Sequence, residues 1–286
     1  MWTNAKKLML VSRPISWVNT AYPFAAGYIM SGGGIDARLI VGTLFFLIPY
    51  NLLMYGVNDV FDYESDIKNP RKGGVEGMRE QREFHPTILR WSIIVALPFV
   101  VALCLLGPWH ASLVLLGVVV VVVAYSVKGL RFKEVPVLDS ITSSIHFVGP
   151  LIYALMLTGG FSSALPYVVA MFAWGVASHA FGAVQDVIPD RRGHLASIAT
   201  VLGARFTVWF SLTCYILASA LVVAQGFPAY VIGIVGLLYC ANLIPFVNIT
   251  DATSGVANRG WKRFLWLNYL IGLIVTIVLI LSYTRP

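Results

Sequence analysis

Residues 91–127 read WSIIVALPFVVALCLLGPWHASLVLLGVVVVVVAYSV, and this stretch contains no Asp, Glu, Lys or Arg. A helix rises 1.5 Å per residue, so a membrane span needs about 20 apolar residues. The stretch is too long for one span, and Gly107-Pro108 near its middle is a turn-forming pair. We therefore expect two membrane-spanning helices joined near residues 107–110.

Five further stretches without these charged residues lie around it, at 14–35, 39–57, 140–185, 206–250 and 264–284. The third and fourth are again too long for one span, and turn residues predict breaks at 158–160 and 225–228. The first is too long for the apolar part of a cleavable signal peptide, so we expect a membrane helix there. The sequence therefore predicts an all-α membrane protein with nine transmembrane helices in one bundle, and residues 1–286 as a single domain.

The composition excludes a water-soluble globular protein. Hydrophobic residues make up 58% of the chain, charged residues only 12%, and the mean hydropathy is +0.79. Soluble domains carry about a quarter charged residues. The net charge of +7 would suggest a nucleic-acid partner in a soluble chain, but in a membrane protein a Lys and Arg bias of cytoplasmic loops is the commoner cause. We expect no nucleic acid and no obligatory protein partner, and we interpret the three cysteines as packing residues.

The charged residues fall mostly on one side of the predicted bundle. With nine helices, 18 of the 20 basic residues share the side of the N-terminus, and only Arg38 and Arg285 lie opposite. The positive-inside rule therefore places the N-terminus and the long loops in the cytoplasm of a multi-pass cell-membrane protein. All acidic residues except Asp36 lie on that side too, and a basic bias does not explain this excess of acids.

Two groups of aspartates account for part of that excess. Residues 58–66 read NDVFDYESD, and a continuing helix would place Asp59, Asp62 and Asp66 within about 60° of one another, while Glu64 points away. The predicted sixth helix ends in QDVIPD at 185–190, where Asp186 and Asp190 are spaced i and i+4. The proline at 189 is expected to loosen that last turn.

Stacked carboxylates repel one another unless a cation lies between them. Oxygen ligands without nearby His or Cys favour Mg²⁺, which completes its shell with water and substrate phosphate. The two clusters would thus hold a diphosphate through bridging ions. The alternative is an acidic loop in ordinary contact with Lys and Arg, which would be favoured for one aspartate but not for five at helical spacing. Basic residues that would stabilise the leaving diphosphate are Lys68, Arg71, Lys72, Lys128 and Arg131, although each is also explained as a positive-inside loop residue.

These motifs identify the chain as similar to the UbiA superfamily of intramembrane prenyltransferases. Residues 58–66 resemble its N-D-x-x-D-x-x-x-D motif, and 186–190 its D-x-x-x-D motif. The stretch from Tyr125 through Lys128 and Arg131 to Asp139 resembles its link between helices four and five, and Arg13, Pro14 and Asn19 its entry to helix one. The resemblance implies a bundle around a central cavity, with Asp59, Asp62, Asp66, Asp186 and Asp190 binding Mg²⁺, Lys128 assisting catalysis, and Asn58, Arg13, Asn19, Tyr125 and the basic residues named above binding diphosphate.

Within the superfamily, RPISWVNT at 13–20 and YESDIKNPRKGGVEG at 63–77 resemble lycopene elongases of C50 carotenoid synthesis. This resemblance implies dimethylallyl diphosphate as donor and lycopene as acceptor, with the final cation losing a proton or taking up water. Two other possibilities stay open. One is the same fold acting on an aromatic or quinone precursor or another lipid acceptor, and the other is a membrane transporter.

Several polar or aromatic residues inside the apolar stretches have both a structural and a functional interpretation. His146 or His179 would suit the final proton transfer, but single intramembrane histidines are more often hydrogen-bonded packing residues. Asn51 is expected to bond across helices. Aromatic rings that would steady an allylic cation, or merely pack, are Trp17, Tyr22, Tyr50, Tyr55, Tyr153 and Trp174.

Overall fold

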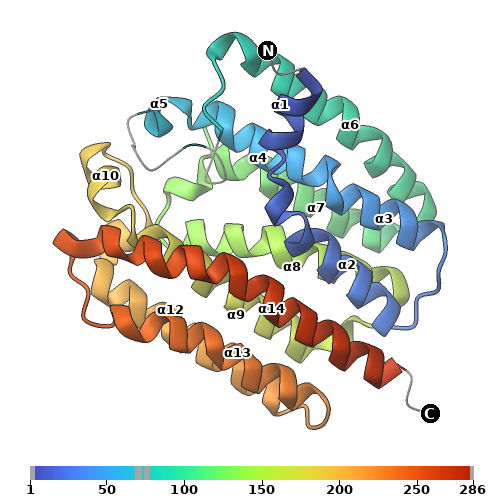
Figure 1. Ribbon diagram of the computed structural model, residues 1–286. Coiled ribbons are helices and arrows are strands. Elements are labelled where there is room, and N and C mark those ends of the chain that lie inside the picture. The colour runs from blue at the N-terminus through green and yellow to red at the C-terminus, as the bar shows by residue number, and fades with distance from the viewer. Residues whose placement is uncertain (1–3, 68–72, 74–77, 284–286) are drawn as a thin grey trace. The chain divides into compact units, whose positions relative to one another are not determined.

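The computed structural model describes residues 4–67, 73 and 78–283, and every regular element in that part is helical (Figure 1). The α-helices are α1 (Asn4–Val11), α2 (Val18–Met30), α3 (Ala37–Leu47), α4 (Pro49–Phe61), α5 (Tyr63–Asp66), α6 (His85–Leu106), α7 (Trp109–Ser126), α8 (Leu138–Thr158), α9 (Phe161–Val184), α10 (Val187–Arg192), α11 (Ile198–Leu202), α12 (Ala204–Val223), α13 (Ala229–Leu243) and α14 (Asn258–Tyr283). Short 3₁₀ helices are η1 (Pro14–Ser16), η3 (Arg82–Phe84), η4 (Phe132–Glu134), η5 (Ile244–Phe246) and η6 (Asp251–Ala257).

The three predicted breaks in the long apolar stretches are confirmed. Helices α6 and α7 are separated by Gly107 and Pro108, as the stretch 91–127 predicts. Helices α8 and α9 meet at Gly159 and Gly160, where Gly159 has the left-handed φ of 78°. Helices α12 and α13 pack against each other and are joined by residues 224–228 (Figure 1). Breaks in long apolar stretches are therefore located correctly by their turn residues.

In the described part of the chain, eight helical segments are long and apolar enough to cross a membrane. The segment that differs from expectation is the first, because residues 14–35 form η1 and the 13-residue α2 rather than one long helix. At 1.5 Å per residue α2 is about 20 Å long, shorter than the roughly 30 Å hydrocarbon layer. The count of nine stays a prediction.

Large apolar side chains cover the outside of the long helices. Leu105 is 81% exposed, Trp109 75% and Trp266 73%, and exposed Leu, Ile and Val residues recur along α6, α7, α12 and α14. A surface of this kind is stable against lipid tails and not against water. The exposed residues therefore agree with the composition: this is a multi-pass membrane protein.

The chain forms two compact units. The first contains residues 1–132 and 146–162, and the second contains residues 133–145 and 163–286. Helix α8 contributes its first part to the second unit and the rest to the first. The expectation of one domain with a central cavity stays a prediction.

A proline break divides the predicted second span of the first unit. Helix α3 ends at Leu47 and α4 begins at Pro49, which has no N–H to continue the hydrogen-bond ladder. The Asn51 amide nitrogen donates to two carbonyls at the end of α3, since it lies 2.8 Å from the Phe46 carbonyl oxygen and 3.1 Å from that of Leu47. It also donates to the hydroxyl of Thr20 on α2, at 2.7 Å. The expected cross-helix bond of Asn51 is thus confirmed.

Aromatic residues fill the cores of both units. In the first, Tyr50 and Tyr153 are fully buried against phenylalanines of α2 and α3. In the second, Trp174 packs against Phe264 and Tyr239, with ring centroids 6.0 Å apart in each pair. Three of the aromatic residues considered for cation stabilisation therefore have a packing role.

Candidate active site

The first aspartate motif lies at the end of α4 and in α5. Asp62 ends α4 with nearly helical backbone angles, and its N–H donates to the Asn58 carbonyl at 2.9 Å. The Asp66 N–H donates in turn to the Asp62 carbonyl, also at 2.9 Å. The helical register therefore continues through the break between α4 and α5, and the expected spacing of Asp59, Asp62 and Asp66 is retained.

All three carboxylates of this motif are buried, with exposed fractions of 3% for Asp59, 5% for Asp62 and 6% for Asp66. Glu64 instead is exposed and forms an ion pair with Arg82. The exclusion of Glu64 from the cluster is consistent with that placement. Burying several carboxylates costs free energy unless cations or hydrogen bonds compensate for the lost water, so the partners of these side chains matter.

Arg13 is one such partner. Its Nη2 atom lies 2.6 Å from Oδ1 of Asp59, and its guanidinium lies over the Tyr55 ring at 4.1 Å. Burial by itself lowers the pKa of Arg13, but the charge and hydrogen bond of Asp59 outweigh it, so the pKa is raised. The second oxygen of Asp59 accepts the backbone N–H of Met78 at 3.2 Å. Arg13, expected at the diphosphate, is therefore next to the first aspartate of the motif.

The stretch after α7 also reaches this motif. Arg131 Nη2 lies 3.8 Å from Oδ1 of Asp62, and its Nη1 donates to the Phe61 carbonyl at 3.2 Å. The Asn58 amide donates to the hydroxyl of Ser126 at 3.1 Å. Ser126 and Arg131 thus contact residues of the first motif, and Asn58 and Arg131 are both expected at the diphosphate.

The other residues expected at the diphosphate have different surroundings. Lys128 is exposed between α7 and η4, and Asn19 is half-buried on α2. Tyr125 packs edge-on against the His146 ring, with centroids 4.9 Å apart. Lys68, Arg71 and Lys72 lie outside the described residues.

The second aspartate motif differs from expectation in one respect. The helix was expected to run through Asp190, but α9 ends at Val184 and a new helix, α10, begins at Val187. Pro189 explains the break, because it lacks the N–H that a continuous helix would direct to the Gln185 carbonyl; proline is tolerated in the first turn of α10. The i and i+4 relation is kept, since the Asp190 N–H donates to the Asp186 carbonyl at 2.9 Å. Both aspartates are half-buried.

The donor groups of the two motifs suit Mg²⁺. Among the described residues, no three His, Cys, Asp or Glu side chains form a metal cage. Mg²⁺ does not need one, because it usually takes one or two carboxylates and completes its shell with water and phosphate oxygens. Buried carboxylates without thiolate ligands have the hard oxygen chemistry that this ion prefers. The residues therefore fit a Mg²⁺ ion that is partly held by its substrate. The motifs belong to different units, and their expected approach to one another stays a prediction.

The two histidines have different surroundings. His146 is 3% exposed, and its carbonyl accepts the hydroxyl of Tyr50 at 2.9 Å. The Nδ1 atom of His179 lies 3.0 Å from the Ser140 hydroxyl. That hydroxyl lies 3.2 Å from Oδ1 of Asp139, whose Oδ2 accepts the Ile198 N–H at 2.7 Å. Asp139 thus connects the start of α8 with the start of α11.

Sequence reasoning missed a second group of polar residues in the second unit, which includes Arg191, Asp251 and Asn258. Asp251 is one of the acids on the predicted side of the N-terminus that a basic bias does not explain, and that excess is the signal that points to it. Its contacts come from residues about fifty positions away, and spacing along the chain does not reveal them.

Apolar helices that end in buried or half-buried aspartates, with arginines beside them, define a helical membrane protein with a candidate site for a cation and an anionic ligand. The chain belongs to the UbiA prenyltransferase family, whose model matches residues 20–268. It is therefore a prenyltransferase, and the transporter alternative is set aside.

Two relatives are similar along nearly the whole chain. The Lycopene elongase/hydratase of Corynebacterium glutamicum is 50% identical over 282 residues, covering 98% of this chain and 98% of that protein. The C(50) beta-cyclic carotenoids biosynthesis protein of a Dietzia species is 51% identical over 277 residues, covering 95% of this chain and 63% of that protein. Among solved structures, a UbiA homolog from Archaeoglobus fulgidus bound to DMAPP and Mg²⁺ matches with a TM-score of 0.66. That match covers 94% of this chain and 99% of that one at 16% identity, which supports the fold.

Proposed function

We propose that the protein transfers a dimethylallyl group from dimethylallyl diphosphate to lycopene in a Mg²⁺-dependent reaction. The observation that carries the proposal is 50% identity, over 98% of both chains, to a protein named lycopene elongase/hydratase. The Archaeoglobus fulgidus structure with DMAPP and Mg²⁺ supports the choice of donor and metal on the same fold.

The proposed metal ligands are Asp59, Asp62, Asp66, Asp186 and Asp190. When bound, Mg²⁺ offsets the negative charge that develops on the leaving diphosphate. Arg13 and Arg131 lie beside carboxylates of the first motif, which supports the proposal that they contact the anionic ligand that the metal would hold. We assign the same task to Lys128, Lys68, Arg71 and Lys72, and diphosphate contacts to Asn58, Asn19 and Tyr125.

The proposed reaction breaks the C–O bond of the donor and releases diphosphate. The terminal double bond of lycopene forms a C–C bond with the allylic cation, which leaves a tertiary cation on the acceptor. That cation then loses a proton or takes up water. Water must stay away until the C–C bond has formed, and the apolar helices of an intramembrane enzyme exclude it.

We further propose that the protein lies in the cell membrane with its N-terminus and both motifs on the cytoplasmic side. The support is the distribution of Lys and Arg, of which 18 of 20 fall on one side of the predicted bundle. We propose that residues 1–286 act as one domain, since the family match at 20–268 spans residues of both units.

A direct assay tests the proposed reaction. Purified protein in detergent, supplied with Mg²⁺, dimethylallyl diphosphate and lycopene, should produce a carotenoid longer than lycopene by one prenyl unit, detected by mass spectrometry. If an aromatic acid or a quinol is prenylated instead, the acceptor is wrong while the prenyltransferase chemistry remains.

Variants of the same protein test the metal ligands. Asp59→Ala and Asp186→Ala should each abolish turnover while the protein stays folded. Asp36→Asn is the control, since Asp36 lies between α2 and α3, where its side chain accepts the Leu39 N–H. Near-normal turnover in either motif variant would overturn the metal assignment for that aspartate.

A further inference from the structure

The segment that carries the second aspartate motif is too short to hold itself in place. Helix α10 has six residues, and residues 185 and 186, which belong to neither helix, separate it from α9. Isolated helices of this length are unstable in water, because the cost of the first turn is not recovered. The positions of Asp186 and Asp190 therefore depend on contacts that other elements make with the ends of the segment.

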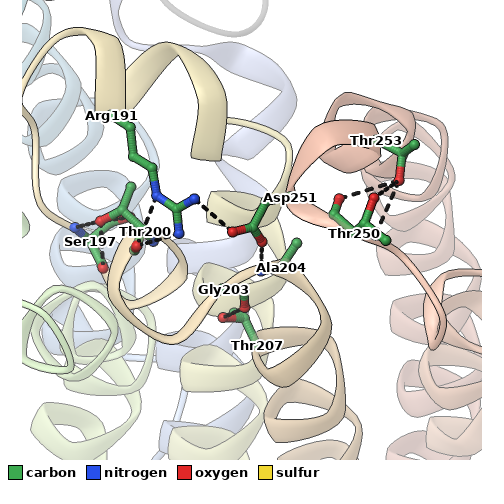
Figure 2. A network of polar contacts seen from close by, with 9 residues as sticks. All are labelled: Arg191, Ser197, Thr200, Gly203, Ala204, Thr207, Thr250, Asp251 and Thr253. Atoms are coloured by element: carbon green, nitrogen blue, oxygen red, sulfur yellow. Dashed lines mark hydrogen bonds and ion pairs between the residues drawn. The ribbon is translucent and has the colours of Figure 1, made fainter.

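Beyond Asp190, the contact is made by Arg191 (Figure 2). Its Nη1 atom lies 2.6 Å from Oδ2 of Asp251, the first residue of η6. Its Nε and Nη2 atoms donate to the Thr200 carbonyl at 3.1 and 2.7 Å. Three hydrogen bonds thus hold the guanidinium of Arg191, the residue that directly follows the last aspartate of the motif.

Asp251 is itself fixed (Figure 2). Its Oδ1 accepts the Ala204 N–H at 2.7 Å, which satisfies one of the unpaired donors at the start of α12. Gly203 has the left-handed φ of 82°, and a Cβ there would lie only 3.3 Å from the same oxygen. A capping box between Thr250 and Thr253 sets the backbone at the start of η6. The Asp251 carboxylate is therefore fixed by contacts other than its ion pair with Arg191.

On the N-terminal side of Asp186, a second contact comes from the residue that follows the other end of η6. Asn258 directly follows η6, and its amide donates to Oε1 of Gln185 at 2.6 Å. The amide nitrogen of Gln185 donates to the Gly182 carbonyl of α9 at 2.9 Å, which fixes that side chain too. The segment Asp251–Asn258, called here the η6 brace, is thus bonded at its first residue to Arg191 and at its last to Gln185. These are the residues that immediately flank the motif.

We propose that Asp251 and Asn258 are positioning residues that hold the segment 186–190 in the geometry that binds metal and diphosphate. The inference rests on the proposed function of that segment. Arg191 and Gln185 transmit the restraint, and neither residue of the brace needs to touch the substrate. Outer partners that orient metal ligands commonly change metal affinity by 10- to 100-fold when removed.

The exposure of the ion pair makes the proposal testable. Arg191 and Asp251 side chains are 42% and 38% exposed, and exposed ion pairs contribute little to stability. If the pair had only a structural role, its removal would therefore change neither the stability of the fold nor ligand binding appreciably. Loss of a restraint on the motif should appear in metal and diphosphate binding and not in the melting temperature of the ligand-free protein.

The experiment compares Asp251→Asn and Asn258→Ala with matched controls in the full chain. Asp251→Asn keeps an oxygen for the Ala204 N–H and removes the charge that faces Arg191. Its control is Asp36→Asn, because Asp36 likewise accepts a backbone N–H at the start of a helix, α3. The control for Asn258→Ala is Asn268→Ala on the same helix, where Asn268 accepts the Tyr239 hydroxyl at 2.8 Å.

The first readout needs no turnover: the melting temperature is followed as Mg²⁺ is titrated in the presence of inorganic pyrophosphate. Both brace variants should need on the order of 10-fold more Mg²⁺ for half of the stabilisation, and their double variant should lose little more than either single one. In turnover, KM for the donor should rise more than kcat falls.

Titration midpoints equal to those of the controls would overturn the proposed role of the η6 brace. A wild-type melting temperature that does not change with Mg²⁺ and pyrophosphate would overturn it too. A wild-type protein that responds to both but does not prenylate lycopene would contradict the proposed function alone. In that case the midpoints of the four single variants and of the double variant still decide the role of the brace.

Discussion

Replacing Arg13 tests whether the first motif depends on its buried ion pair. The side chains of Arg13 and Asp59 are 14% and 2% exposed, and the shortest distance between their charged atoms is 2.6 Å. Removing one partner of a buried pair costs about 3–5 kcal/mol, because the other charge stays buried without compensation. Asp59 keeps the Met78 N–H, so we expect Arg13→Gln to lower the free energy of unfolding by about 3 kcal/mol, the lower end of that range.

The double variant Arg13→Gln/Asp59→Asn buries two neutral amides and no charge. It should therefore be within about 1 kcal/mol of the wild type, far from the sum of the single effects. The assay is unfolding in detergent with EDTA present, followed by tryptophan fluorescence. Lys7→Gln is the matched control, since Lys7 and Glu80 are also 2.6 Å apart but Lys7 is 30% exposed, and we expect less than about 1 kcal/mol. Equal losses in Arg13→Gln and Lys7→Gln, or additive single effects, would refute the reasoning.

Three further predictions concern topology, metal and packing. In a variant without native cysteines, single cysteines at positions 79 and 108 should be labelled from opposite membrane faces, and labelling of both from one side would contradict the proposed topology. Removing divalent ions with EDTA should abolish prenyl transfer, and Mg²⁺ should restore it; activity that persists in EDTA would exclude a required metal. Asn51→Ala should lower the free energy of unfolding by about 1 kcal/mol, since intramembrane hydrogen bonds average about 0.6 kcal/mol and the two N–H groups that the three acceptors share are lost. Thr213→Ala, which removes an exposed bond to the Trp209 carbonyl, is its control, and equal losses in the two would contradict the role of Asn51.

The helical hairpins were predictable because their cause is local. A lipid-embedded backbone must satisfy its hydrogen bonds within each segment, so apolar length and turn residues are enough to locate α6 and α7 or α12 and α13. The first span was predicted less well. Apolar length alone does not reveal that α2 ends at Met30, or that Pro49 divides the next span and Asn51 donates to the Phe46 carbonyl near that division.

Some features of the candidate site were likewise predictable from the sequence, and others were not. Helical spacing predicted that Asp59, Asp62 and Asp66 lie near one another, and the backbone hydrogen bonds of Asp62 and Asp66 maintain that spacing. Spacing did not predict that the helix before Asp186 ends at Val184, although Pro189 supplies the reason. The excess of acids on the predicted side of the N-terminus indicated that Asp251 needed an explanation, but it did not indicate which residues Asp251 contacts.

The sequence by itself determined the membrane class, the hairpins and the two aspartate motifs, because apolar length, turn residues and helical periodicity act over a few turns of one chain segment. Only the tertiary structure decided which cation lies beside Asp59, that Arg131 reaches Asp62, and that η6 contacts both ends of the second motif. Those contacts join residues separated by tens of positions. Their geometry depends on how helices pack and where loops return, and no local pattern encodes it.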